Sequence, residues 1–342
     1  MTQPFAELLA NVLYQQVNLR PTVCHALTSL VEKNNRILQQ NLSDAELTRQ
    51  YRLTNAEIQQ NINLLSTFAP NFLSILFNVF SQTMPPYRSP IGDCIKAFLS
   101  IASPEVDPRL DSISQQDLRS VFAKVSSLLR DNLAQKGEKT ELPSLAQTAI
   151  DLTNIIIPYL PADTFVDLWS LVTPLLGLKD DPNMQRRGYR CLTKLAEVEN
   201  GKTYIANKLD QVEAILKRTD AHTISQKDRI LALHRIIDLV PTESLHIIPT
   251  VLPEAVIGTK ENNEKAREAA YNLLIAMGRK MQAGGTVKNA MVDGMDEDAA
   301  DTKATIGEYF LMVSAGLAGT SQHMVSATIT ALSRMLYEFK GT

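Results

Sequence analysis

A stretch around residue 200 comes close to a phosphate-binding loop. Residues 196–203 read Ala-Glu-Val-Glu-Asn-Gly-Lys-Thr, which matches the P-loop pattern except for an alanine at the first glycine. A P-loop needs a strand before it and a helix that begins at its lysine, so that backbone N–H groups surround the phosphate. Residues 189–198 instead have helical spacing, and Glu197 and Glu199 would repel phosphate. We therefore interpret the segment as a turn between two helices.

Other residue types that carry chemistry do not form a recognisable site either. The five histidines have neither the HExxH arrangement nor any short metal-binding spacing. Ser314 lacks the flanking glycines of a nucleophile elbow, and Asp163 and Asp167 are one helical turn apart, as on any solvated helix face. The single tryptophan, Trp169, lies among apolar residues and is expected in the core. The sequence therefore predicts no catalytic residue, no metal site, no cofactor and no small-molecule substrate.

Basic residues cluster in one predicted helix. Arg187, Arg190 and Lys194 share a face of that helix, and Arg186 lies beside them. The stretch from 179 to 280 has 17 Lys and Arg against 14 Asp and Glu, while the first 171 residues have 13 against 16. Two interpretations stay open, a solvated face of paired charges or a stripe that contacts phosphates. For the second, the nucleic-acid contacts would be Arg186, Arg187, Arg190, Lys194, Arg218, Lys227 and Arg235.

Composition narrows the function classes. The 342 residues are 44% hydrophobic, enough for a large core, and the net charge is −3 with a pI of about 6.0. This balance gives no reason to expect indiscriminate nucleic-acid binding. No apolar run is judged to reach the roughly 20 residues that a membrane span needs, so no membrane partner is expected. The three cysteines are widely spaced and are interpreted as core thiols in a reducing compartment.

The elements that must hold these residues are helices throughout, because every periodic segment has helical spacing and no convincing strand is found. Prolines mark predicted helix starts, and Pro70 is expected to kink or divide its helix. The helices are expected near residues 4–18, 22–39, 55–83, 91–102, 114–136, 144–160, 163–177, 182–198, 203–218, 224–240, 243–257 and 261–282. In the helix at 114–136, the apolar face comprises Leu118, Val121, Phe122, Val125, Leu128, Leu129 and Leu133.

Two polar interruptions divide the chain. Residues 103–113 contain two prolines and three acids, and residues 284–301 combine three glycines with five acids. The second segment is expected to be a mobile insertion, either a solvated loop or a docking peptide for a basic partner. The predicted organisation is N-terminal hairpins at 1–102, a connection at 103–113, central repeats at 114–283, the insertion at 284–301 and a last helix pair at 302–342.

The last forty residues indicate stacked repeats. Residues 308–319 and 323–340 form two apolar helices joined by a glycine-containing corner, and such a pair cannot bury its apolar stripe alone. In the second helix the stripe comprises Met324, Ala327, Thr328, Ala331, Met335 and Phe339. We therefore predict an all-α fold, a right-handed HEAT/armadillo-type α-solenoid of antiparallel helix pairs, and expect Leu128, Leu129, Ile236 and Leu332 in its core.

The amino-acid sequence of these and two other segments resembles that of the ribosomal RNA-processing protein 12 family. The resemblance rests on EYFLMVSAGLAG at 308–319, HMVSATITALSRMLYEFK at 323–340, LLGLKDDPNMQRRGYRCL at 175–192 and LLIAMGRKM at 273–281, and it is strong only over residues 140–342. The family comprises HEAT-type solenoids that assist ribosome assembly and export. The chain looks like a central-to-N-terminal segment of such a protein, without the lysine-rich tail of the family.

The resemblance implies a non-enzymatic ribosome-biogenesis factor. It would act in pre-ribosomes, chiefly small-subunit precursors, and support pre-rRNA processing and nuclear export. The implied partners are pre-rRNA and pre-ribosomal assembly proteins, with the small GTPase Ran and phenylalanine-glycine nucleoporins implied by relationship only. The implied location is the nucleus and nucleolus, with shuttling to the cytoplasm on export particles.

Two other function classes remain open on the residues alone. A karyopherin-like nuclear transport receptor would use the same solenoid as a cargo surface and would bind Ran loaded with GTP but not GDP. An enzyme built on the helices would need a cleft with converging polar groups, which the linear sequence does not reveal.

Overall fold

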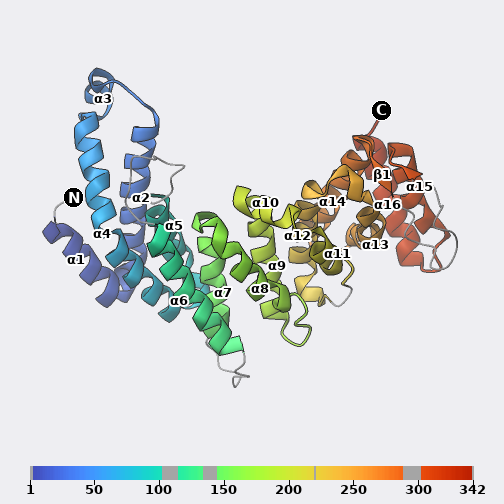
Figure 1. The fold of residues 1–342 in the computed structure, drawn as a ribbon, viewed down its shortest axis with the longest axis horizontal. Coiled ribbons are helices and arrows are strands. Elements are labelled where there is room, and N and C mark those ends of the chain that lie inside the picture. Colours follow the sequence, from blue (N-terminus) through green and yellow to red (C-terminus); the bar gives the residue numbers. More distant parts are fainter. Residues whose placement is uncertain (1–2, 102–114, 134–144, 219–220, 288–301, 341–342) are drawn as a thin grey trace. The chain divides into compact units, whose positions relative to one another are not determined.

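The protein folds into two units of packed helices. The structure is a computed structural model that describes residues 3–101, 115–133, 145–218, 221–287 and 302–340. An N-terminal unit covers Met1–Leu168 and a C-terminal unit covers Trp169–Thr342. The division falls within helix α8 (Phe165–Leu175), and each unit is described here by itself (Figure 1).

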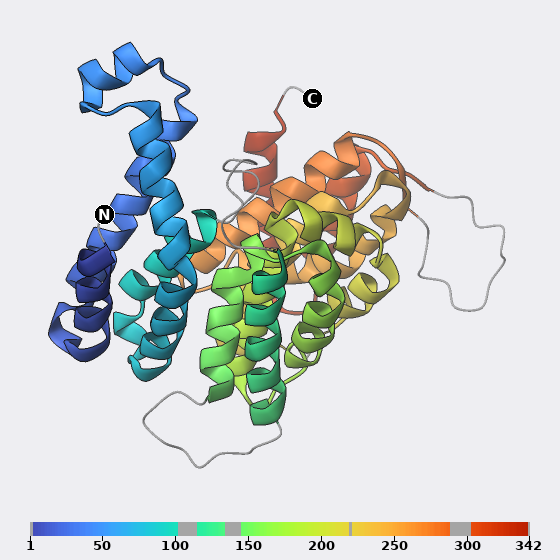
Figure 2. The same cartoon turned by 60° about the vertical axis from the view of Figure 1, so that its left-hand side comes forward.

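The N-terminal unit is built on two long helices, α2 and α4, that lie side by side and against α5 (Figures 1 and 2). Helices α6 and α7 form a second packed pair. The elements are α1 (Gln3–Gln15), η1 (Val17–Leu19), α2 (Arg20–Gln39), α3 (Asp44–Tyr51), α4 (Asn55–Gln82), η2 (Pro85–Tyr87), α5 (Ser89–Ile101), α6 (Gln115–Leu133), α7 (Leu145–Ile156), η3 (Ile157–Tyr159) and η4 (Ala162–Thr164).

Helix α3 was not among the expected helices. It lies at the end of the α2–α4 pair (Figure 2). A capping box begins it, since the Ser43 hydroxyl accepts from the Glu46 N–H while the Glu46 carboxylate accepts from the Ser43 N–H. Arg52 ends it in the left-handed region at φ 56°. The Ser-x-x-Glu spacing was the available signal, but the eight-residue helix is too short to show a clear apolar period.

Two effects were expected of Pro70, a kink or a division of its helix, and the division does not occur because α4 continues through this proline as one helix. The uninterrupted helix has 28 residues and is, by length and composition alone, apolar enough to cross a membrane, contrary to the judgement made from the sequence. Its buried residues, which include Ile62, Leu65 and Leu73, contribute to the core of the N-terminal unit. Packing against α2 and α5 therefore accounts for the apolar composition.

The C-terminal unit has three neighbouring helices, α9, α12 and α14, with α12 in the middle. Helices α13, α15 and α16 pack onto α14 and onto one another (Figure 1). The elements after α8 are α9 (Pro182–Glu197), α10 (Glu199–Ala206), α11 (Leu209–Leu216), η5 (Thr223–Ser225), α12 (Gln226–Leu239), η6 (Thr242–Ile247), α13 (Ile248–Gly258), α14 (Glu264–Gln282), β1 (Thr286–Val287), β2 (Thr302–Lys303), α15 (Ile306–Ser314), η7 (Ala315–Ala318) and α16 (Gln322–Glu338).

Two expectations for this unit are wrong. The helix expected at 203–218 is two helices, α10 and α11, because the chain leaves helical geometry at Lys208. Two short strands exist where none was expected, with Thr286 opposite Lys303 and Val287 opposite Thr302 in an antiparallel ladder. Two residues are too few to produce a readable alternation of apolar and polar positions.

The strand β1, at the start of the expected insertion, is paired with β2, and Gly285 directly before it packs closely. Gly285 has φ +141°, a conformation that favours glycine, and a Cβ there would lie 2.5 Å from the Thr242 carbonyl oxygen. Its own carbonyl accepts a hydrogen bond from the Ala304 N–H. Gly285 thus lies against Thr242, and the strand that follows it is paired, while residues 288–301 lie outside the described residues.

The core follows the predicted stripes where their side chains are described. Phe122 and Val125 of α6 are buried, whereas the other five predicted positions of that face lie outside the described side chains. In α16, Ala327, Thr328, Ala331 and Met335 are buried and Met324 is half-buried, and Phe339, directly after the helix, is buried as well. Ile236 is buried as expected, but Leu332 is only half-buried, at the edge of its stripe. All three cysteines are buried free thiols.

Candidate nucleic-acid interface

The segment that resembles a P-loop is a turn between two helices, as the sequence predicted. Helix α9 ends at Glu197, α10 begins at Glu199, and only Val198 between them is extended. A helix and not a strand precedes the lysine, and Lys202 pairs with Glu199, with an Nζ–Oε2 distance of 3.0 Å. The glycine serves packing instead, because a Cβ at Gly201 would collide with the Leu195 carbonyl oxygen.

This contact makes a prediction for Gly201. Replacing Gly201 with alanine should destabilise the C-terminal unit by roughly 1–3 kcal/mol, as overpacking does, because the backbone of α9 must move. Gly307→Ala is the matched control, since it also lies in the first turn of a helix and its Cβ would meet nothing closer than 3.7 Å. Urea unfolding followed by Trp169 fluorescence measures both variants. Equal midpoints for the two variants would contradict the packing role.

The remaining candidates for chemistry show structural roles. Trp169 is buried as predicted, and its indole N–H donates to the Gln211 side-chain oxygen at 2.6 Å. Burial is the main influence on His234 and lowers its pKa, against the opposing effect of Asp238. Within the described ranges, no group of three or more His, Cys, Asp and Glu side chains is placed to hold a metal ion.

The predicted basic residues lie mainly on two adjacent helices. Arg187, Arg190 and Lys194 come from α9, and Lys227 and Arg235 come from α12. The two helices run in the same direction, because the Ser225 hydroxyl beside the start of α12 donates to the Pro182 carbonyl at the start of α9. We call the surface formed by these five residues the α9–α12 face.

Acidic side chains on the same helices neutralise much of the α9–α12 face. Arg190 pairs with Asp228 at 3.1 Å and Arg235 with Glu197 at 3.4 Å, so both bridges join α9 to α12. Lys194 also pairs with Glu197, at 2.8 Å. The two pairs with Glu197 are partly exposed and contribute little to stability, about 0–1 kcal/mol each, whereas the Asp228 side chain is only 10% exposed. The face is one of mixed charge rather than a uniformly positive stripe.

The other two predicted residues are placed differently. Arg186 is half-buried beside the α9–α12 face. Arg218 follows α11, and its guanidinium packs against Gly177, in the turn that leads from α8 to α9. The structure therefore brings together the residues of α9 and α12, while Arg218 belongs to a connection.

A polar groove of about 590 Å³ lies beyond α12, between α12, α14 and α16. Its lining includes the cations Arg279, Lys280 and Arg334, and we call it the α12–α14–α16 groove. It is lined by His234, Asp238, Thr242, Asn272, Ile275, Ala276, Arg279, Lys280, Ala283, Arg334 and Glu338. The members come from segments about a hundred residues apart, so spacing along the sequence could not group them.

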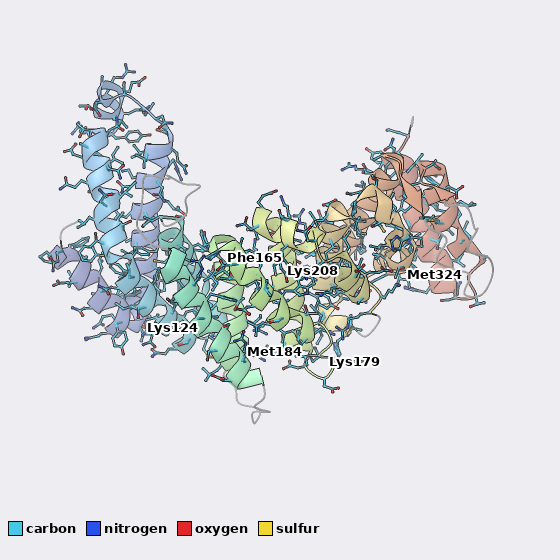
Figure 3. The ribbon with its side chains drawn as sticks, in the orientation of Figure 1. Lys124, Phe165, Lys179, Met184, Lys208 and Met324 are labelled. Atoms are coloured by element: carbon cyan, nitrogen blue, oxygen red, sulfur yellow. The ribbon has the colours of Figure 1, made fainter. Side chains whose placement is uncertain are left out.

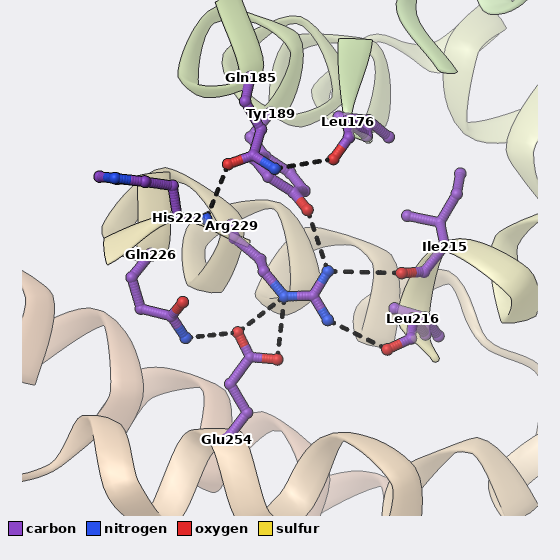
Figure 4. Close-up of polar contacts among 9 residues, drawn as sticks. All are labelled: Leu176, Gln185, Tyr189, Ile215, Leu216, His222, Gln226, Arg229 and Glu254. Atoms are coloured by element: carbon purple, nitrogen blue, oxygen red, sulfur yellow. Dashed lines mark hydrogen bonds and ion pairs between the residues drawn. The ribbon is translucent and has the colours of Figure 1, made fainter. Parts of the chain in front are cut away.

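A buried arginine holds the helices behind these surfaces (Figure 4). The Arg229 side chain is 2% exposed, and its Nε donates to both oxygens of Glu254 at 2.8 and 3.0 Å. Its Nη1 donates to the Tyr189 hydroxyl at 3.1 Å, and the two terminal nitrogens reach the Ile215 and Leu216 carbonyls at the end of α11. Burial lowers the pKa of Arg229, but hydrogen bonding and attraction from Glu254 outweigh it and raise the pKa above its ordinary value.

This arginine connects four helices. It extends from α12 to Tyr189 of α9, to the carbonyls of α11 and to Glu254 of α13 (Figure 4). Gln226 also donates to Glu254, at 2.7 Å. The α9–α12 face and the start of the groove are thus carried by a framework of fixed geometry. Sequence reasoning missed Arg229 because a charged residue in an amphipathic helix is assigned to solvent by default.

Packed helix pairs with an internal framework of this kind define a helical-repeat protein of the HEAT/armadillo class. The family model described as ribosomal RNA-processing protein 12, HEAT repeats, matches residues 1–83. The sequence resemblance therefore extends into the N-terminal unit, which corrects the expectation that it was strong only from residue 140. The family's fold and the all-α architecture agree.

Relatives with this name match nearly the whole chain. Ribosomal RNA-processing protein 12 of Saccharomyces cerevisiae is 35% identical over 99% of this chain and 27% of its own length. The putative ribosomal RNA-processing protein 12 of Schizosaccharomyces pombe is 33% identical over 99% of this chain and 28% of its own. A human RRP12-like protein is 26% identical over 98% of this chain and 22% of its own length. The chain is thus a relative of ribosomal RNA-processing protein 12 and spans about a quarter of the length of these proteins.

Proposed function

We propose that the chain is a helical-repeat scaffold of a ribosome-biogenesis factor that acts in ribosomal RNA processing. The relationship to ribosomal RNA-processing protein 12 over 99% of the chain carries this proposal. The factor works in pre-ribosomes of the nucleolus, chiefly small-subunit precursors, and accompanies them during export. Its partners are pre-rRNA and pre-ribosomal assembly proteins.

The α9–α12 face contributes to contact with pre-rRNA in this proposal. Its cations sit on helices held rigidly by Arg229, while Asp228 and Glu197 limit their net charge. A face of mixed charge disfavours indiscriminate adsorption to nucleic acid and favours docking where the geometry of the phosphates fits. The net charge of −3 for the whole chain has the same effect.

Affinity purification of the chain from cells, followed by sequencing of the associated RNA, tests the proposal. We expect enrichment of small-subunit rRNA precursors over mature rRNA. The variant Arg187→Glu with Lys227→Glu should reduce this enrichment at least severalfold, because two phosphate contacts become repulsive. Arg190 is left intact, since reversing its charge would place a carboxylate beside Asp228.

A matched control reverses two lysines outside the α9–α12 face. Lys179 precedes α9 and Lys208 lies between α10 and α11 (Figure 3), so Lys179→Glu with Lys208→Glu changes the net charge equally. Equal loss in both double variants would show that only bulk charge matters. If no precursor rRNA is recovered and the chain binds Ran loaded with GTP but not Ran loaded with GDP, the result would favour the transport receptor instead.

A further inference from the structure

We propose that the α12–α14–α16 groove, together with the tyrosines beside it, is a binding site for single-stranded RNA. Phosphates would enter the groove near Arg279 and Arg334, and a base would stack on Tyr337. This site is separate from the α9–α12 face and shares with the proposed function only the class of ligand.

Some of the cations that line the groove are available to bind phosphate. Lys280 donates to the Asp238 and Val240 carbonyls, both at 2.8 Å, so its ammonium satisfies the last turn of α12. Arg334 pairs with Glu338 at 2.8 Å, an exposed pair that a phosphate can replace. Arg279 is exposed, and no hydrogen bond or ion pair links its guanidinium to another of the described residues. With the two acids included, a net positive charge remains.

Aromatic rings alternate with cations at the edge of the groove. The Arg334 guanidinium carbon lies 5.9 Å from the ring centre of Tyr271 on α14 and 5.8 Å from that of Tyr337 on α16. The Lys340 ammonium lies 4.7 Å from the Tyr337 ring centre. Arg334, Tyr337 and Lys340 lie within seven residues of one another in the sequence. Tyr271 is more than sixty residues away, and only the packing of α14 against α16 brings it to the same place.

This combination is the one that sequence-tolerant sites for single strands use, a cationic groove that follows the backbone beside aromatic rings that stack on bases. Tyr337 remains 63% exposed with the cations in place, so much of its side chain is accessible to a base. The volume of the groove lies within the roughly 300–1,000 Å³ that is usual for sites that enclose small ligands. A single strand can offer an unstacked base to Tyr337, whereas a duplex keeps its base faces inside the stack. The carboxylates of an acidic peptide could pair with the cations but would not stack on the rings of Tyr271 and Tyr337.

Binding of the full 342-residue chain to a fluorescent single-stranded U12 RNA tests the site, with the matching RNA duplex as a second probe. We expect the single strand to bind more tightly. Tyr337→Ala should weaken its binding roughly tenfold and Tyr337→Phe should restore it, because stacking on a ring is worth about 1–3 kcal/mol per base. Arg279→Gln should weaken binding and reduce the slope of log K against log salt by about 0.7.

Lys265→Gln is the matched control for Arg279→Gln, since Lys265 is an exposed cation of the same helix that does not line the groove. Unchanged U12 affinity in Tyr337→Ala and Arg279→Gln, with both variants folded by circular dichroism, would overturn the proposal. Equal affinity for strand and duplex, or direct binding of an acidic peptide in the absence of RNA binding, would overturn it as well. These results are independent of whether precursor rRNA is recovered from cells, so the two proposals can fail separately.

Discussion

Replacing Glu254 with glutamine is expected to destabilise the C-terminal unit by about 3–5 kcal/mol. The Arg229 side chain is 2% exposed and cannot regain water, so neutralising Glu254 leaves a buried charge without its counter-ion. Burial then acts on Arg229 without the compensation that now raises its pKa. Urea unfolding followed by fluorescence measures the loss, because the single tryptophan, Trp169, is a buried residue of this unit.

Two further variants identify the cause. Arg235→Gln removes a partly exposed ion pair with Glu197 and should cost less than about 1 kcal/mol. Glu254→Asp keeps the charge but shortens the reach, and should fall between the two. A loss for Glu254→Gln that is no larger than the loss for Arg235→Gln would mean that Arg229 is hydrated in solution and does not hold the helices together.

Truncating Ile236 to alanine should cost about 2–5 kcal/mol, the range for buried aliphatic side chains. Ile236 is 1% exposed within α12, the helix between α9 and α14, so its cavity cannot collapse without moving both neighbours. Leu332→Ala removes the same number of carbon atoms from a half-buried position on α16 and should cost less, because water already reaches that side chain. The same fluorescence experiment measures both.

The ordering of these two variants is the decisive result. From the sequence alone, Ile236 and Leu332 were equivalent core positions, whereas the structure distinguishes them by burial. A larger loss for Leu332→Ala would show that the end of α16 is covered in solution. Equal losses would mean that the helix phase at Leu332 is wrong.

The sequence predicted the helical class well because burial of one helix face imposes a period that can be read directly. The α16 stripe at Ala327, Ala331 and Met335 is an example, and each of these residues is buried. Short elements gave no such signal. Helix α3 depends on its capping box, and the strands at Thr286 and Thr302 depend on partners distant in the chain.

The candidate sites were less predictable because they depend on which helices become neighbours. Helical spacing grouped Arg187, Arg190 and Lys194, and these residues do lie together on α9. It could not reveal that Arg190 meets Asp228 of another helix, or that Tyr271 and Arg334 meet across α14 and α16. Partners that neutralise or extend a charged surface are a property of the packing, not of the local sequence.

The ladder between Thr286 and Lys303 also makes this part of the chain modular. The strands fix the two points between which residues 288–301 run, and Gly285 anchors the first of them against Thr242. A longer connection between fixed points costs only closure entropy, about 0.6 kcal/mol for each doubling of its length. Sequence can therefore be gained or lost between the strands while α14 and α15 keep their register, which makes this junction a natural place for a grafted domain.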